Sequence, residues 1–499
     1  MSDTRMNFVI INPDEWRGDY AGCYGHPLVK TPNLDRLAAE GTRFDNCFVQ
    51  HTVCSPSRCS FVTGWYPHVA GHRDLTHLLR TDEPNMFKYL RNAGYEVAWF
   101  GKNDMLSQAS FRESVDFYDS YRGFLPPTIR NAFEFGEPGY YSFLYEPTPG
   151  TIDDHVDALE VAAGIEYLEK GRNLEKPFCL FLPLVTPHCP FTAPEPYHSM
   201  YSPDDVPPLR APVEEGKPGF YRRIRETRAL DRTSEETFRK LNAVYLGTIT
   251  LIDELIGRVL DALDRLGLAD TTTVLVYSDH GEWAGDFGLV EKWSSGLDDP
   301  LTRVPFVVRT PGGKAGHVVA EPVEMFDQMA TVLELAGVKA QHTHFARSLV
   351  PQLRGAPGDP DRAVFAEGGK GMHEPHVFEA NPTDSDWHET RDKGNIYYPK
   401  LALQHDEPET DTRCTMIRTM THKLVRRAES GEHELYDLTA DPQEMHNRYG
   451  DPAYAEVQRE LETRMLDWYV RTSDVTPFDT DPRQMPPESR YWPRVRIGE

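Results

Sequence analysis

The chain has 499 residues, 39% of them hydrophobic and 11% aromatic, and carries a formal net charge of −25 at pH 7. This length allows one large domain and a smaller one, and the composition is that of a globular protein. The acidity argues against nucleic acid and anionic membrane surfaces as partners, because both would be repelled.

The N-terminal sequence and the number of cysteines both indicate the cellular compartment of the protein. No apolar run reaches the roughly 18 residues of a transmembrane helix. Residues 1–7 lack the basic and then apolar pattern of a signal peptide. The seven cysteines are odd in number and scattered, which is typical of a reducing compartment rather than of a disulfide framework. We therefore expect a cytoplasmic protein.

Short apolar runs and amphipathic segments alternate along the first two thirds of the chain. The apolar runs, rich in β-branched or aromatic residues, are 7–11, 96–100, 178–185 and 272–277. Segments with apolar residues at helical spacing are 32–41, 153–170, 237–266 and 324–336. This interleaving predicts an α/β fold, in which ligands bind beyond the carboxyl ends of the strands.

Polar residues follow each of the predicted strands. In chain order they are Asp14 and Glu15, Lys102, His188, and Asp279 and His280. Three carboxylates gathered with an imidazole at one edge of a sheet would repel one another unless a cation lay between them. The sequence therefore predicts a site for one divalent metal ion. Calcium prefers oxygen ligands, so the imidazole favours manganese, and both ions remain candidates.

Residues 54–64, C-S-P-S-R-C-S-F-V-T-G, have the features of a short helix with a reactive N-terminus. Pro56 suits a first helical turn and Gly64 suits a helix end. Cys54 would then lie where unpaired N–H groups favour negative charge. Arg58 follows one turn later and could reach back toward position 54.

The last third of the chain differs from the rest. Residues 368–412 are polar and weakly periodic, which predicts a long loop. Segments 415–426 and 432–438 are predicted strands, and 441–473 contains a predicted helix. We expect a catalytic domain over 1–370 and a C-terminal subdomain over 371–499, with a loop near the site at about 371–412 and an extended tail from 477.

The segment that begins at Cys54 resembles the signature of the type I sulfatases and their phosphonate monoester hydrolase relatives, within the alkaline phosphatase superfamily. In that family the cysteine is oxidised to formylglycine, whose hydrated aldehyde is the nucleophile. The resemblance implies this modification of Cys54 by a formylglycine-generating enzyme. It also implies an alkaline-phosphatase-like α/β sandwich with a large central mixed β-sheet flanked by helices. The small C-terminal subdomain should hold an antiparallel sheet and a helix.

The same resemblance implies roles for residues elsewhere in the chain. Lys102 in G-K-N-D and Lys292 in E-K-W match the family's two active-site lysines, and His188 in T-P-H-C-P-F matches its histidine. With Cys54 and Arg58 they form the predicted catalytic set. The metal ligands implied are Asp14, Glu15, Asp279 and His280. Many sulfatases have a histidine where this chain has Asp104, so the role of Asp104 stays open, as does that of His72.

The resemblance implies hydrolysis of the sulfuric ester of a small aryl or alkyl alcohol. The main alternative is a phosphonate monoester or phosphodiester hydrolase with side activity on sulfates. The phosphonate hydrolases have a tyrosine-threonine segment where this chain has Lys102, which favours the sulfate. Two further alternatives are an inactive sulfatase-like binding protein and a metal-free Cys-His hydrolase. The expected substrate is a small anionic ester, and a homo-oligomer is left open.

Overall fold

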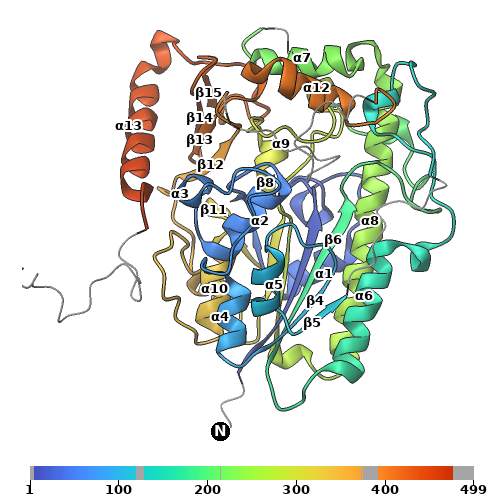
Figure 1. Cartoon of the computed structure of the whole chain (residues 1–499), viewed down its shortest axis with the longest axis vertical. Coiled ribbons are helices and arrows are strands. Elements are labelled where there is room, and N and C mark those ends of the chain that lie inside the picture. The colour runs from blue at the N-terminus through green and yellow to red at the C-terminus, as the bar shows by residue number, and fades with distance from the viewer. Residues whose placement is uncertain (1–4, 120–128, 214, 373, 375–391, 476–499) are drawn as a thin grey trace, which may run out of the picture.

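An eight-stranded mixed sheet forms the centre of the molecule (Figure 1). The computed structural model describes residues 5–119, 129–213, 215–372, 374 and 392–475. The strands lie in the order β10-β2-β9-β7-β1-β6-β4-β5. Their bounds are β1 (Asn7–Asp14), β2 (Thr42–Phe44), β4 (Glu96–Phe100), β5 (Phe117–Asp119), β6 (Phe178–Pro187), β7 (Thr272–Tyr277), β9 (Phe306–Arg309) and β10 (His317–Val319). All four predicted strands are confirmed as β1, β4, β6 and β7.

The strands at the centre of this sheet are parallel and buried on both faces. β1 pairs in parallel with β6 and with β7, and β4 pairs in parallel with β6. Side chains alternate along β1, with Val9 and Ile11 in one apolar cluster and Phe8 and Ile10 in the other. A strand covered on both faces has a continuous apolar sequence, as this one does.

Helices cover both faces of the sheet. One face packs against α1 (Pro32–Glu40), α6 (Val156–Glu166) and α8 (Glu235–Arg265). The other packs against α2 (Cys54–Thr63), α4 (Met86–Asn92) and α10 (Asp327–Leu335). The four amphipathic segments are confirmed as α1, α6, α8 and α10, and α6 continues into a π-helical turn at Tyr167–Gly171.

Shorter elements connect these layers. A three-stranded sheet in the order β11-β3-β8 joins β11 (Val323–Glu324), β3 (Cys47–Phe48) and β8 (Arg303–Val304). The remaining helices before the C-terminal part are α3 (Pro67–Ala70), α5 (Gln108–Ser114), α7 (Gly219–Thr227), α9 (Asp299–Thr302) and α11 (Val350–Leu353).

The C-terminal part contains a four-stranded antiparallel sheet and a packed helix. Its elements are β12 (Val364–Gly368), β13 (Cys414–Arg418), β14 (His422–Arg427), β15 (Glu434–Asp437) and α13 (Ala455–Thr472), which lies at the left edge of Figure 1. The antiparallel sheet and helix are as expected. The strand predicted over 415–426 is wrong, because β13 and β14 are two strands joined by a turn. The sheet also begins at β12, before residue 370.

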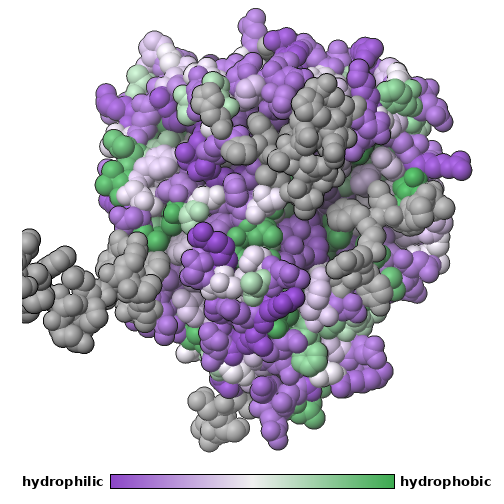
Figure 2. Space-filling view, viewed as in Figure 1, coloured by the Kyte–Doolittle hydropathy of each residue, from purple (hydrophilic) through white to green (hydrophobic). Residues whose placement is uncertain are grey.

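The long loop predicted over 368–412 is only partly correct. Helix α12 (Tyr398–Asp406) and a 3₁₀ turn at Pro408–Asp411 lie within it. The rest of the expected loop is largely outside the described residues, as is the tail from 477. Within the described ranges, no helix is long and apolar enough to cross a membrane. The face in Figure 2 is mostly hydrophilic, with apolar residues in separate patches.

Candidate active site

The residues predicted to act together meet at the carboxyl ends of the central strands. Asp14 ends β1, Asp279 and His280 follow β7, His188 follows β6 and Lys102 follows β4. Because these strands are parallel, their ends open at one edge of the sheet, where α/β proteins bind ligands. The N-terminus of α2 brings Cys54 to the same edge.

Four residues form a compact group that could hold a metal ion. One ligand atom each of Asp14, Cys54, Asp279 and His280 lies within 4.8 Å of the others, and all four residues are buried. Arg58 Nε donates a hydrogen bond to Asp279 Oδ2 at 2.7 Å and Nη2 donates to Asp14 Oδ2 at 3.2 Å. The guanidinium therefore holds both carboxylates in place.

Asp14 and His280 are in the protonation states that bind a divalent metal ion. Burial alone would raise the pKa of Asp14, but Lys102, His188 and Arg58 hold it well below its usual value. Burial lowers the pKa of His280, so the imidazole stays neutral, which is the form that binds metal. An ionised carboxylate and a neutral imidazole fit the oxygen and nitrogen ligands of a divalent ion.

Cys54 is the first residue of α2. Its Sγ lies 3.2 Å from His280 Nε2 and 3.6 Å from Asp14 Oδ1. Val53 precedes it as the N-cap without a side-chain cap, and Gly64 ends the helix with φ of 70°. Burial, and then the charge of Asp14, raises the pKa of the Cys54 thiol well above its ordinary value. An unmodified thiol is therefore a poor nucleophile at this position.

Lys102 extends the group on one side. Its Nζ pairs with a carboxylate oxygen of Asp14 and lies 2.7 Å from Asp104 Oδ2. Burial would lower the pKa of Lys102, but Asp104 and Asp14 raise it above its ordinary value, so the ammonium stays charged. Asp104, whose role the sequence leaves open, is thus an ionic partner of Lys102.

His188 and Lys292 form a pair on the other side. Lys292 Nζ lies 2.7 Å from His188 Nε2, and His188 Nδ1 lies 2.5 Å from the carbonyl oxygen of Cys189. With Nδ1 donating to that carbonyl, Nε2 accepts a hydrogen bond from the ammonium. This arrangement brings two proton-carrying groups together at the edge of the site.

Glu15 joins the His188 side rather than the four-residue group. Its carboxylate groups with His188 and Cys189, with one ligand atom of each within 4.8 Å of the others. Its backbone N–H donates to Asp279 Oδ1 at 3.1 Å. Burial raises the pKa of Glu15 well above its usual value despite Lys292 nearby, and Oε1 is buried without a hydrogen-bond partner. Lys292 Nζ lies 3.5 Å from this Oε1, so an ammonium already faces the carboxylate. The fit to a metal ion therefore rests on the oxygen and nitrogen ligands of Asp14, Asp279 and His280.

The sequence reasoning missed two buried carboxylates. Glu282 Oε1 accepts from the backbone N–H of Glu291 at 2.6 Å. Glu291 itself binds Arg228 and, at 2.5 Å, Lys400 Nζ of α12. Glu291 immediately precedes Lys292, and Glu282 lies in the S-D-H-G-E motif, so adjacency to predicted site residues was the available signal.

His72 lies outside this group. Its Nε2 is 3.1 Å from Glu83 Oε1, and its Nδ1 is 2.5 Å from the carbonyl oxygen of His77. Both ring nitrogens are therefore engaged within the segment that follows α2 and α3.

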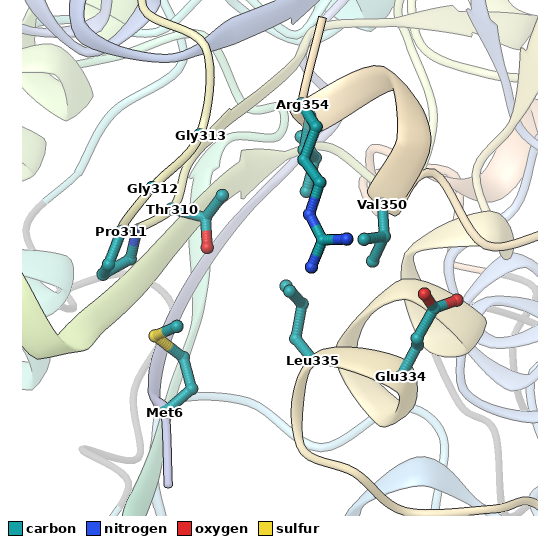
Figure 3. A pocket seen from close by; sticks show the side chains of 10 residues that line it. Met6, Thr310, Pro311, Gly312, Gly313, Glu334, Leu335, Val350 and Arg354 are labelled. Atoms are coloured by element: carbon teal, nitrogen blue, oxygen red, sulfur yellow. The ribbon is translucent and has the colours of Figure 1, made fainter. Parts of the chain in front are cut away.

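A separate cavity of about 210 Å³ opens at the opposite end of the sheet (Figure 3). Met6, just before β1, and Thr310, just after β9, line it together with Arg354, whose guanidinium points into the cavity. Arg354 is exposed on the surface. Because this cavity lies at the amino ends of the parallel strands, it is remote from Cys54 and the carboxylates.

Comparison with known proteins agrees with this geometry. The sulfatase family model matches residues 6–338, and the model for the C-terminal part of N-sulphoglucosamine sulphohydrolase matches residues 381–471. The multifunctional alkaline phosphatase superfamily protein PehA of Trinickia caryophylli is 30% identical, over 95% of this chain and 97% of its own length. The ulvan-active sulfatase of Formosa agariphila is 28% identical over 93% of this chain and 80% of its own length.

Solved structures share the fold. The phosphonate monoester hydrolase of Agrobacterium radiobacter superposes with a TM-score of 0.74 and 24% identity, covering 94% of this chain and 96% of that one. The expected alkaline-phosphatase-like fold is therefore confirmed. The chain belongs to the sulfatase family, a class of sulfuric ester hydrolases.

Proposed function

We propose that this protein hydrolyses the sulfuric ester of a small organic alcohol, with a formylglycine made from Cys54 as the nucleophile. The observation that carries the proposal is the grouping of Cys54 with Asp14, Asp279 and His280 within 4.8 Å. A nucleophile, metal ligands and a cationic clamp are the parts that transfer of a sulfuryl group needs.

Asp14, Asp279 and His280 would hold the divalent ion, and Glu15 would complete the set from the His188 side. A bound divalent cation would lower the pKa of a coordinated hydroxyl, as metals do for water. Arg58 and Lys102 remain charged and would stabilise the negative charge that builds on the sulfuryl oxygens. The identity of the ion, calcium or manganese, belongs to the proposal.

The reaction would proceed as a displacement at sulfur, followed by an elimination of sulfate from the side chain of residue 54. One hydroxyl of the hydrated aldehyde attacks sulfur, and the bond from sulfur to the alcohol oxygen breaks. The Lys292–His188 pair gives a proton to the departing alkoxide. The second hydroxyl then loses its proton, the aldehyde re-forms, and sulfate leaves. A cysteine or serine could not complete this last step without a separate hydrolysis.

Sulfate is favoured over phosphonate because of Lys102. The charge of the ester does not separate the two, because sulfate monoesters, phosphonate monoesters and phosphodiesters each carry one negative charge. The family resemblance implies a lysine at this position in sulfatases but not in phosphonate hydrolases, and Lys102 here lies between Asp14 and Asp104. The second candidate function, a phosphonate monoester or phosphodiester hydrolase, is favoured by the structural likeness to such an enzyme.

A matched panel of an aryl sulfate, an aryl phosphonate monoester and an aryl phosphodiester tests the choice. We expect the highest kcat/KM on the sulfate and measurable side activity on the other two. A phosphonate monoester that is turned over better than every sulfate would transfer the assignment to the second candidate. A protein inactive on all three, with formylglycine and metal both verified, would indicate the binding-protein alternative.

Four further expectations accompany this proposal. Maturation would require a formylglycine-generating enzyme. A cytoplasmic location is expected from the odd number and scattered positions of the seven cysteines in the sequence. The division into a catalytic domain over 1–370 and a C-terminal subdomain, and the open question of a homo-oligomer, likewise remain predictions.

A further inference from the structure

The residue directly before Lys292 has an unusual backbone conformation. Glu291 has φ of 65°, in the left-handed region that favours glycine. A residue with a side chain costs about 1 kcal/mol or more in this conformation, and it keeps the conformation only where its surroundings fix it. The side chains of Glu291 and Lys292 are both fully buried. Contacts inside the fold therefore hold this residue in place.

Four contacts fix both the backbone and the carboxylate of Glu291. Arg228 donates from Nη1 to the carbonyl oxygen of Val290 at 2.8 Å, and its Nη2 pairs with Glu291 Oε2. The backbone N–H of Glu291 donates to Glu282 Oε1 at 2.6 Å. Lys400 Nζ donates to Glu291 Oε1 at 2.5 Å. The peptide that leads into Lys292 is thus held from several directions.

Two helices supply the cations that bind Glu291. Arg228 is the C-cap of α7 and Lys400 lies on α12, and the two helices are neighbours at the top of Figure 1. Ile224 and Leu403, one from each helix, share an apolar cluster with Trp293, which follows the catalytic lysine. The C-terminal part of the chain, through α12, therefore takes part in holding the segment that carries this lysine.

Glu291 Oε1 faces two ammonium groups at unequal distances. It lies 2.5 Å from Lys400 Nζ and 3.8 Å from Lys292 Nζ. Lys292 Nζ lies closer to His188 Nε2, at 2.7 Å, and 3.5 Å from Glu15 Oε1. The close pair with Lys400 therefore keeps the Glu291 carboxylate from closing on Lys292. Inside the protein such charge–charge attractions are strong, so losing either partner would move the Lys292 ammonium.

Resting on the proposed function, in which the Lys292–His188 pair gives a proton to the departing alkoxide, we propose that Glu291 and Lys400 are positioning residues for Lys292. Glu291, held by Lys400, keeps the Lys292 ammonium at hydrogen-bond distance from the imidazole of His188. The two residues place the proton-donating pair and exchange no proton themselves. Their loss should therefore act on the departure of the alcohol, most strongly where the alkoxide most needs a proton.

Two aryl sulfates with different leaving groups test this proposal. The nitro group of 4-nitrophenyl sulfate spreads the charge of the departing phenolate, which then needs little protonation, whereas phenyl sulfate lacks this help. We expect Glu291→Gln to lower kcat/KM about 10-fold to 100-fold on phenyl sulfate and only about 3-fold or less on 4-nitrophenyl sulfate. A purely structural role would lower kcat/KM on both esters by the same factor, which would overturn the proposal.

Glu444→Gln is the matched control. Glu444 is also buried, has φ of 61° and pairs with a buried lysine, Lys423, but none of these contacts belongs to the site. Its replacement should lower stability while keeping the wild-type ratio of kcat/KM between the two esters. Lys400→Met is the second variant and should shift the ratio in the same direction as Glu291→Gln. A wild-type ratio in Lys400→Met overturns the role of α12.

Crystal structures of Glu291→Gln and Lys400→Met separate this proposal from the proposed function. We expect Lys292 Nζ to leave hydrogen-bond distance of His188 Nε2 in both variants. A distance that stays at the 2.7 Å of the wild type overturns the positioning role, whatever the enzyme hydrolyses. A displaced Lys292 in a protein whose mature wild type hydrolyses neither ester would keep the positioning role and contradict the proposed function. Hydrolysis of both esters with an unchanged ratio would do the reverse.

Discussion

At residue 54 the local environment opposes ordinary thiol chemistry. The thiol is buried at a helix N-terminus, close to a carboxylate and a neutral imidazole, and its pKa is raised. A hydrated aldehyde in the same place would present hydroxyls to the same neighbours and would not need to ionise as a thiol. Burial thus explains why an unmodified Cys54 would be a weak nucleophile, whereas the proposed formylglycine would avoid this cost.

Formylglycine at position 54 can be detected directly. The tryptic peptide 44–58 contains both Cys47 and Cys54. In protein made with the maturation enzyme present, we expect aldehyde at position 54 and an intact thiol at Cys47, measured by mass spectrometry and hydrazide labelling. Full activity in protein whose Cys54 remains a thiol would contradict the mechanism.

Asp279 should be needed for metal content as well as for turnover. Asp279→Asn removes a charged ligand, so we expect bound metal and kcat/KM to fall together, with metal measured by mass spectrometry of the purified protein. Asp253→Asn is the control, since Asp253 is equally buried but binds the backbone of α1 at Asn33 and Leu34. Activity that survives complete metal removal would favour the metal-free alternative.

Lys102 should contribute to the transition state. Lys102→Ala is expected to lower kcat/KM on the aryl sulfate about 10²-fold or more, the scale of losing one transition-state donor. Lys88→Ala, which removes a surface ion pair with Glu113, should leave the rate within a few-fold. Sulfatase turnover untouched by Lys102→Ala would remove the basis for choosing sulfate.

At the scale of elements, the stability of α2 depends on the glycine at its C-terminal end. Gly64 adopts φ of 70°, and a Cβ there would lie 2.7 Å from Met329 Cε and 2.9 Å from His344 Cβ. Both the backbone conformation and the space therefore require glycine. The end of α2 packs against α10, so the nucleophile helix is tied to the core on the far side from the site.

Gly64→Ala should destabilise the fold more than a glycine replacement at an open helix end. We expect the free energy of unfolding to fall by about 2 kcal/mol or more, from left-handed strain together with the clash. Gly71→Ala is the control, because Gly71 has φ of 80° but nothing within 4 Å of its Cβ position. Its cost should be near 1 kcal/mol, and equal losses in urea unfolding would contradict the packing argument.

At the scale of the whole molecule, buried histidines make stability depend on pH. Burial lowers the pKa of His342 to about 4 and of His51 to about 3. At pH values between these and the ordinary histidine value near 6.5, the unfolded chain binds protons that the folded chain does not. Stability from these groups is therefore complete above pH 6.5 and is lost as the pH falls toward 4.

Urea unfolding at pH 7 and at pH 5 measures this loss. Each buried histidine is expected to add up to about 1.4 kcal/mol per pH unit to the slope of the free energy of unfolding against pH. His342→Gln should flatten the slope by about that amount, whereas His446→Gln, at a side chain that is 69% exposed, should not change it. A slope unaffected by His342→Gln would show that this histidine titrates normally in the folded state.

The elements that have a strong local signal could be predicted from the amino-acid sequence. The four buried strands are continuous apolar runs, and α8 shows helical periodicity over most of its length. The polar residues that follow these strands could be expected to meet because parallel strands end at one edge of a sheet. The motif at Cys54 carried the family resemblance, which the family comparison confirms.

Features that depend on partners distant in the chain could be seen only in the folded structure. The sequence predicts one strand over residues 415–426 because the turn between β13 and β14, at Thr419–Thr421, has no glycine, proline or asparagine to mark it. Helix α12 was missed because Lys400 and Gln404 are buried through polar contacts with Glu291 and Asp411, which no hydrophobic period records. The Glu15 carboxylate groups with His188 rather than with Asp279 and His280 because β1 pairs with β6, where Asp14 lies opposite Pro187. Local sequence encodes which face of an element is buried, but only packing determines which polar groups then meet.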